Sequence, residues 1–85
     1  MESVQRRSSL EVIADILRLK EASKTRIMYS CNMSYHQLQR YLQILLARGF
    51  LEKVIVPNPG VKYRITEQGK ALLEAIDQVT ELLKY

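Results

Sequence analysis

Cysteine and histidine each occur once in this sequence of 85 residues. The lone Cys31 can form neither an intramolecular disulfide nor a cysteine-based zinc site, which fits a reducing, intracellular compartment. His36 has no acidic or sulfur-containing neighbour at a spacing suited to catalysis or metal binding. Because the chain also lacks a nucleophile–base pair and a glycine-rich phosphate loop, the sequence predicts neither an enzyme nor a cofactor nor a metal site.

Long apolar runs are missing as well. No stretch approaches the roughly 20 residues that a helix needs to span a bilayer. Glu11 and Asp15 interrupt the apolar region that follows the basic N-terminus, so we expect no signal peptide. The sequence therefore predicts a cytoplasmic protein with no membrane partner.

Acidic residues are scarce in the middle of the chain. From Lys24 to Arg64, seven lysines and arginines are opposed by Glu52 alone. The formal net charge of +4 resides in residues 1–48, which have eight basic and four acidic residues, whereas residues 49–85 have five of each. Such asymmetry is typical of a surface that binds a polyanion such as nucleic acid.

Two apolar stripes characterise the first predicted helix, which begins at the capping box of Ser8 and Glu11. The first stripe consists of Leu10, Ile13, Ala14 and Leu17, and the nearly opposite second stripe consists of Val12, Ile16 and Leu19. A helix that is apolar on two sides usually has two packing partners. We expect the core of the domain to be one partner and a second subunit to be the other.

The next segment predicts a helix-turn-helix. Lys24–Thr25 is expected to be either a brief strand or the start of a short helix with Thr25 as its N-cap. Ser34 and Gln37 form a second capping box, so a longer helix is expected to begin there after a turn. This helix is expected to end at Gly49, in the left-handed conformation that glycine readily adopts.

A β-hairpin and a final helix complete the expected fold. Apolar and β-branched residues in 50–56 and 61–65 predict two strands, and the prolines and glycine of residues 57–60 predict the turn between them. Thr66 is expected to cap a helix that runs to about Lys84. Apolar residues at 4-3-4 spacing form a short coiled-coil seam in this helix: Leu72, Ile76, Val79 and Leu83, flanked by Leu73 and Leu82.

These elements predict a mainly α-helical fold with a small β-hairpin (α+β), a winged helix-turn-helix followed by a dimerisation helix. Residues 1–7 are expected to form a flexible basic arm, residues 8–66 the winged helix-turn-helix domain, and residues 67–85 the C-terminal helix for dimerisation. A domain of this size buries a modest part of its surface, so some of its apolar residues are expected to contact a partner.

Four segments, in this order, carry a resemblance to a known family: Ser23–Tyr29, Met33–Leu38, Tyr41–Leu51 and Tyr63–Lys70. The chain resembles the archaeal ArnR-type winged helix-turn-helix family, and is most similar to the small archaeal chromatin-associated DNA-binding proteins of that class. The similarity extends over roughly residues 8–85. The last segment alone is common to many winged-helix regulators, whereas the combination of all four in order is more specific.

The resemblance implies a homodimer in which the C-terminal helices form an antiparallel coiled coil and two winged helices are presented to DNA. The C-terminal helix is short for that class, at about 18 residues or about 27 Å. We therefore expect either a close spacing of the two DNA-binding units or a contribution from the first helix. The residues expected at the dimer interface are Val12, Ile16, Leu19, Leu72, Ile76, Val79, Leu82 and Leu83.

The sequence thus predicts a homodimer that binds double-stranded DNA in the nucleoid, as either a transcription regulator or an architectural chromatin protein. The recognition helix, residues 34–48, is expected in the major groove, and the wing, residues 50–65, on the backbone or in the minor groove. Base readout and phosphate contact remain alternatives for the helix. The residues expected to contact DNA are Lys24, Arg26, Ser34, Tyr35, His36, Gln37, Gln39, Arg40, Gln43, Lys62 and Arg64.

A second hypothesis is a winged helix that serves as a protein–protein interaction module in a transcription or replication complex. It predicts that salt hardly affects partner binding and that Arg40 and Lys62 are dispensable. The concentration of basic residues in 24–64 favours the DNA hypothesis. Neither hypothesis requires a small-molecule ligand, and the sequence predicts none.

Overall fold

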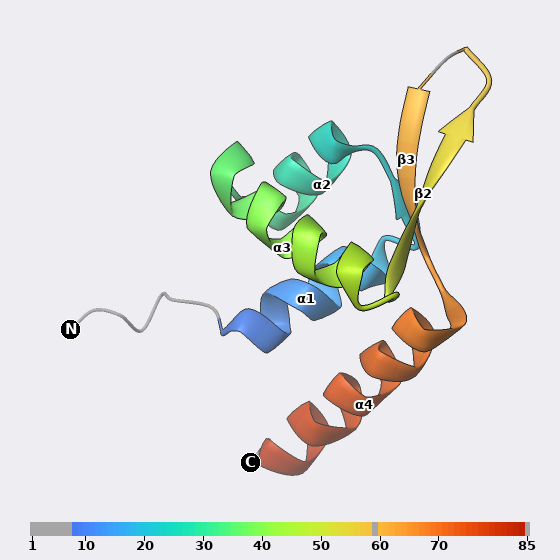
Figure 1. Ribbon diagram of the computed structural model, residues 1–85. Helices are drawn as coiled ribbons and strands as arrows, with labels where there is room; N and C mark the ends of the chain where they lie inside the picture. The colour runs from blue at the N-terminus through green and yellow to red at the C-terminus, as the bar shows by residue number, and fades with distance from the viewer. Residues whose placement is uncertain (1–7, 59, 85) are drawn as a thin grey trace.

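The computed structural model describes residues 8–58 and 60–84 (Figure 1). The described elements follow in the order α1 (Ser9–Arg18), β1 (Glu21–Ala22), α2 (Lys24–Cys31), α3 (Tyr35–Ala47), β2 (Leu51–Val56), β3 (Gly60–Ile65) and α4 (Glu67–Leu83). The chain is mostly helical with a small antiparallel sheet, which confirms the predicted fold class. The expected basic arm of residues 1–7 lies outside the described residues.

Hydrogen bonds at the N-caps confirm two of the predicted helix starts. The Ser8 hydroxyl oxygen accepts from the backbone N–H of Glu11 at 3.2 Å, and the Glu11 carboxylate accepts from the N–H of Ser8 at 3.1 Å. Ser34 and Gln37 form the same reciprocal pair at the start of α3. The predicted end of α3 is confirmed too, because Gly49 follows the helix with a φ of 78°.

The start of α2 differs from the prediction. Ser23 is the N-cap, because its hydroxyl oxygen accepts from the N–H of Arg26 at 3.2 Å, and Thr25 already lies inside the helix. The short strand also lies earlier than expected, at Glu21–Ala22, where it pairs with β3. The start of α2 is thus marked by a local cap, whereas the position of the short strand depends on pairing with a segment far away in the sequence.

The strands form an antiparallel sheet in the order β1-β3-β2, and directly opposed residues share a face of the hairpin. The inner face, whose base is buried against the helices, consists of Leu51, Lys53, Ile55, Val61, Tyr63 and Ile65. The outer face consists of Glu52, Val54, Val56, Lys62 and Arg64. The far end of the hairpin extends beyond the helices (Figure 1).

The core lies where α1, α2, α3 and the base of the hairpin meet. Its largest fully buried side chains are Leu17, Ile27, Leu38 and Leu45. Burial of an aliphatic side chain of this size stabilises the fold by about 1.5–3 kcal/mol. Ile16, expected at a dimer interface, also belongs to this core and is only 2% exposed. The second stripe of α1 therefore packs mainly within its own chain, with Val12 and Leu19 half-buried against the core.

The last helix, α4, begins at the junction between α3 and β2. The Thr66 hydroxyl donates to the carbonyl oxygen of Gly49 at 2.6 Å, and its oxygen accepts from the N–H of Gly69 at 3.0 Å. Thr66 is therefore the N-cap, as predicted. A Cβ atom at Gly69 would overlap the carbonyl oxygen of Phe50, so only glycine allows this close approach. The start of α4 is fixed against the turn that ends α3.

From there α4 lies along α1, on the side opposite α2 and α3 (Figure 1). Ala14 and Ile76 are buried where the two helices meet, and the guanidinium of Arg18 lies 3.0 Å from the carboxylate of Asp77. Ile76, expected at a dimer interface, is 5% exposed because its own chain covers it. The apolar side chains that α4 leaves exposed come later: Val79, Leu82 and Leu83.

Candidate nucleic-acid interface

One side of α3 is buried and the other is exposed. Leu38, Leu42 and Leu45 fix the helix against the core. No acidic residue occurs between Glu21 and Glu52, so neither α2 nor α3 contains a carboxylate side chain. Six of the residues expected to contact DNA lie on the exposed side of α3: Tyr35, His36, Gln37, Gln39, Arg40 and Gln43.

Two of the side chains expected to contact DNA are used by the helix itself. Ser34 Oγ accepts from the N–H of Gln37, and Gln37 Oε1 accepts from the N–H of Ser34, each at 3.1 Å. These bonds satisfy backbone donors that are otherwise unpaired at a helix start. The side-chain oxygens of Ser34 and Gln37 therefore hold α3 in place and are already engaged.

Lys24 and Tyr35 connect the starts of α2 and α3. The Nζ atom of Lys24 lies 5.5 Å from the centroid of the Tyr35 ring, within the range of a cation–π interaction. Lys24 is the first residue of α2 and Tyr35 the first of α3. The contact orients a positive charge beside the exposed side of α3.

A groove of about 290 Å³ separates the exposed side of α3 from the inner face of the hairpin. We call it the helix–wing groove. Its lining comprises two lysines, two glutamines and an apolar floor: Lys24, Lys53, Gln39, Gln43, Leu42, Leu46 and Tyr63. Amines and amides can donate to phosphate oxygens, and no carboxylate lines this groove to oppose them. The arrangement suits the passage of one strand of a nucleic-acid backbone.

Lys53 was missing from the predicted site. It pairs with Tyr63 across the hairpin, which places it on the inner face and in the helix–wing groove. Strand alternation alone puts Lys53 on the same side of β2 as the buried Leu51. This alternation could have been read from the sequence. It identifies Lys53 as a site residue only when the hairpin is known to pack beside α3.

Lys62 and Arg64, the two wing residues that were predicted, lie on the opposite, outer face of the hairpin. Arg64 Nε lies 3.0 Å from Glu52 Oε2, and an Arg64 terminal nitrogen lies 4.0 Å from Glu21 Oε1. Two carboxylates thus offset the charge of Arg64. The structure therefore does not bring Arg64 and Lys62 together with Lys24 and Lys53 in one groove.

The two remaining predicted basic residues are exposed at the edges of the helix-turn-helix. Arg26 lies in the first turn of α2. Arg40 lines a small hollow of about 190 Å³ between α3 and the start of α1, together with Gln37, Tyr41 and Ile44. Arg26 belongs to α2 and Arg40 to α3, and neither helix contains a carboxylate side chain.

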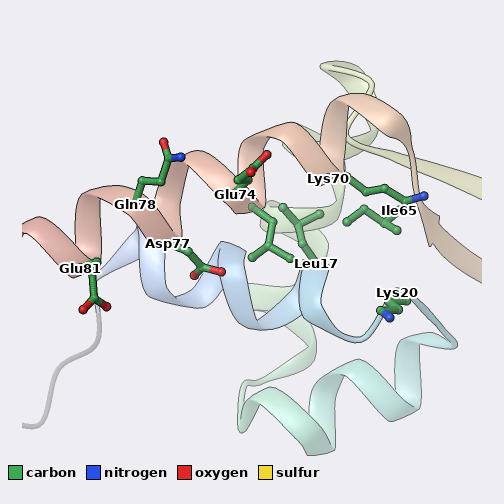
Figure 2. Close-up of a pocket in the computed structure, with 9 residues that line it drawn as sticks. Leu17, Lys20, Ile65, Lys70, Glu74, Asp77, Gln78 and Glu81 are labelled. Atoms are coloured by element: carbon green, nitrogen blue, oxygen red, sulfur yellow. The ribbon is translucent and has the colours of Figure 1, made fainter.

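A larger hollow of about 740 Å³, between α1 and α4, has a different character (Figure 2). Glu74, Asp77 and Glu81 follow one another along α4, and Leu17 lies at the base of the hollow. Lys20 and Lys70 also line this hollow, and Asp77 is paired with Arg18. Because carboxylates oppose a polyanion and α3 has none, the side of the molecule with α3 and the hairpin is the better candidate interface.

Within residues 8–58 and 60–84, no group of three or more histidine, cysteine, aspartate or glutamate side chains is placed to hold a metal ion. None of the described helices is long and apolar enough to cross a membrane.

A family model described as winged helix-turn-helix matches residues 6–84. Two proteins of Methanocaldococcus jannaschii are similar in sequence. The uncharacterised protein MJ0287 is 33% identical over 81 residues, with 92% of this chain and 78% of that protein covered. The uncharacterised protein MJ0290 is 35% identical over 81 residues, but these cover only 36% of its length.

Among solved structures, the DNA-binding protein Sso10a-2 of Sulfolobus solfataricus is similar over 93% of this chain and 99% of its own, with 29% identity and a TM-score of 0.73. A cysteine-to-serine mutant of Escherichia coli MarR, solved in complex with operator DNA, is similar over 81% of this chain and 51% of its own. Its TM-score is 0.70 and its identity 24%, so this likeness concerns the fold alone.

Proposed function

Because this chain belongs to the winged helix-turn-helix family, we propose that it binds double-stranded DNA, with residues 34–48 as the recognition helix. The observation that carries the proposal is the helix–wing groove, where Lys24 and Lys53 lie beside a helix without carboxylates. The similar Sso10a-2, a DNA-binding protein, supports the same function.

In this proposal α3 enters the major groove, which is wide enough for one α-helix. His36, Arg40 and Gln43 then face the base edges, with Arg40 on the side of α3 nearer α1 and Gln43 on the side nearer the hairpin. Arginine pairs well with guanine and glutamine with adenine, and each bidentate pair contributes about 1–3 kcal/mol of discrimination. Gln39 lines the helix–wing groove, toward the DNA backbone, and Tyr35 lies beside Lys24, which lines the same groove.

One phosphate strand would run through the helix–wing groove, between α3 and the hairpin. Lys24 and Lys53 would contact its phosphates from two sides, and Arg26 the phosphates that flank them. Such contacts release counterions, so the affinity falls steeply as salt rises. Lys62, on the outer face of the hairpin, adds positive potential but no contact inside the groove.

We also propose a homodimer whose interface consists of fewer residues than the sequence predicted, at the end of α4. Val79 and Leu82 are 47% and 83% exposed, and Leu83 is 70% exposed, so the end of α4 lacks a covering element within the described chain. Pairing of two such ends would bury these side chains. Residues 8–66 would then act as the DNA-binding unit and residues 67–85 as the pairing helix.

Fluorescence anisotropy with labelled duplexes of 20–30 base pairs tests the DNA proposal. Duplexes of unrelated sequence are titrated at several salt concentrations. We expect binding at low salt and a linear fall of the logarithm of the affinity with the logarithm of salt concentration. Similar affinities for all duplexes would favour an architectural protein, and unequal ones a regulator. Absence of binding at low salt would overturn the proposal and favour the protein-interaction alternative.

A further inference from the structure

The far end of the hairpin carries an exposed apolar pair. Ile55 and Val61 are cross-strand partners on the inner face, and they are 73% and 40% exposed. Wing ends that contact only phosphates would be expected to carry basic side chains, yet this pair is purely aliphatic. Residues 53–66, which include most of the hairpin, contain no aspartate or glutamate.

The apolar pair continues the face that lines the helix–wing groove. Ile55 lies two residues beyond Lys53 on the same strand face, and a strand advances about 3.4 Å per residue. The pair therefore lies about 7 Å farther out than the Lys53 backbone. Val61 lies the same two residues from Tyr63, which anchors the face with 6% exposure.

The position of Ile55 and Val61 relative to the helix–wing groove suggests which part of a DNA duplex they would contact. A phosphate strand in the helix–wing groove separates the major groove, which holds α3, from the adjacent minor groove. In the proposed DNA complex, side chains that lie past Lys53 on the same face would reach that minor groove. Proteins that bind there often insert aliphatic side chains between base steps, which unstacks the bases and bends the duplex by about 20–90°.

We propose that Ile55 and Val61 form an apolar wedge that enters the minor groove and bends the DNA. This inference rests on the proposed DNA binding, and it adds a distortion that phosphate contacts alone do not require. Flexible pyrimidine–purine steps under the wedge would bind best, because they unstack at the lowest cost.

The test uses the full chain and a duplex of about 20 base pairs, about 68 Å long, with a fluorescence donor and acceptor at its ends. We expect energy transfer to rise when the wild-type protein binds. The variant I55T/V61T keeps β-branched side chains of similar size, so the hairpin is retained. At saturating protein this variant should bind the duplex without the rise in energy transfer.

Two comparisons make the result specific. The variant V54T/V56T likewise replaces two aliphatic residues by threonine, but on the outer face, and it should bend DNA as the wild type does. The salt dependence of binding should be the same for all three proteins, because no phosphate contact changes. Circular dichroism and thermal unfolding show that each variant is folded.

Each outcome decides the matter. A duplex that binds wild-type protein without a rise in energy transfer overturns the wedge and leaves the DNA-binding proposal intact. Equal bending by I55T/V61T, or equal loss of bending in V54T/V56T, also overturns it. Absence of duplex binding by the wild type overturns both proposals together.

Discussion

Arg64 and Glu52 face each other across the hairpin, with the guanidinium Nε 3.0 Å from the carboxylate Oε2. Glu21 in β1 places a second carboxylate 4.0 Å from the same guanidinium. Within the described residues, Lys53 on the inner face forms no ion pair of the kind that Arg64 forms with Glu52. Two basic residues of one hairpin are therefore predisposed to different roles.

We expect Lys53→Gln to weaken duplex binding and to reduce the slope of log affinity against log salt by about one, as for a lost phosphate contact. Arg64→Gln should leave that slope unchanged, because the two carboxylates already offset the charge. Anisotropy titrations at several salt concentrations measure both variants. Equal slopes for Lys53→Gln and wild type would exclude Lys53 from the interface.

The capping box of α3 predicts a stability effect at Ser34. Ser34→Ala removes the acceptor for the N–H of Gln37 and should lower the free energy of unfolding by about 1 kcal/mol. Ser30, exposed inside α2, provides the matched control, and Ser30→Ala should cost little or nothing. Urea denaturation followed by circular dichroism compares the two. Similar losses for both variants would contradict a specific capping role.

The two glycines Gly69 and Gly60 differ sharply in the space around them. A Cβ at Gly69 overlaps the Phe50 carbonyl oxygen, whereas a Cβ at Gly60 lies 3.5 Å from a Val56 methyl group in ordinary contact. Gly69→Ala should therefore lower the free energy of unfolding by about 1–3 kcal/mol, and Gly60→Ala by much less. Thermal unfolding checks this order, and equal melting temperatures for the two variants would refute it.

The proposed pairing through the end of α4 predicts the mass of the particle in solution. The wild type should scatter light as twice its 9.9 kDa chain mass, and V79E/L82E as a folded monomer. Glutamate at Ile76 is a poor test, because that side chain is buried within its own chain. The control Q78E/T80E adds the same charge at exposed neighbouring positions. A V79E/L82E dimer would place the interface elsewhere.

Most of the helices and strands could be predicted from patterns among residues that are close together in the sequence. The reciprocal bonds of Ser8 with Glu11 and of Ser34 with Gln37 depend on residues three apart, so their pattern is visible without tertiary structure. The two-residue strand β1 is different, because it exists only through pairing with β3. A brief strand was expected only at Lys24–Thr25, as one of two alternatives, and the N-cap of α2 was expected at Thr25, two residues after the observed Ser23.

The candidate site was less predictable because faces depend on tertiary packing. Alternation places Lys62 and Arg64 on one side of the strand, but it does not say which side packs beside α3. Ile16 illustrates the same limit in a helix. Its stripe was recognised as apolar, yet periodicity alone does not distinguish a covering element of the same chain from a second subunit.

The hydrogen bond from Thr66 to Gly49 has a mechanical consequence. It joins the first turn of α4 to the residue where α3 ends, while the N–H of Thr66 donates to Phe50 immediately before β2. Force applied along α4 would therefore reach the end of α3 and the start of the hairpin through the same residue. In the proposed dimer, bending between the two DNA-binding units is expected mainly in the part of α4 beyond the buried Ile76.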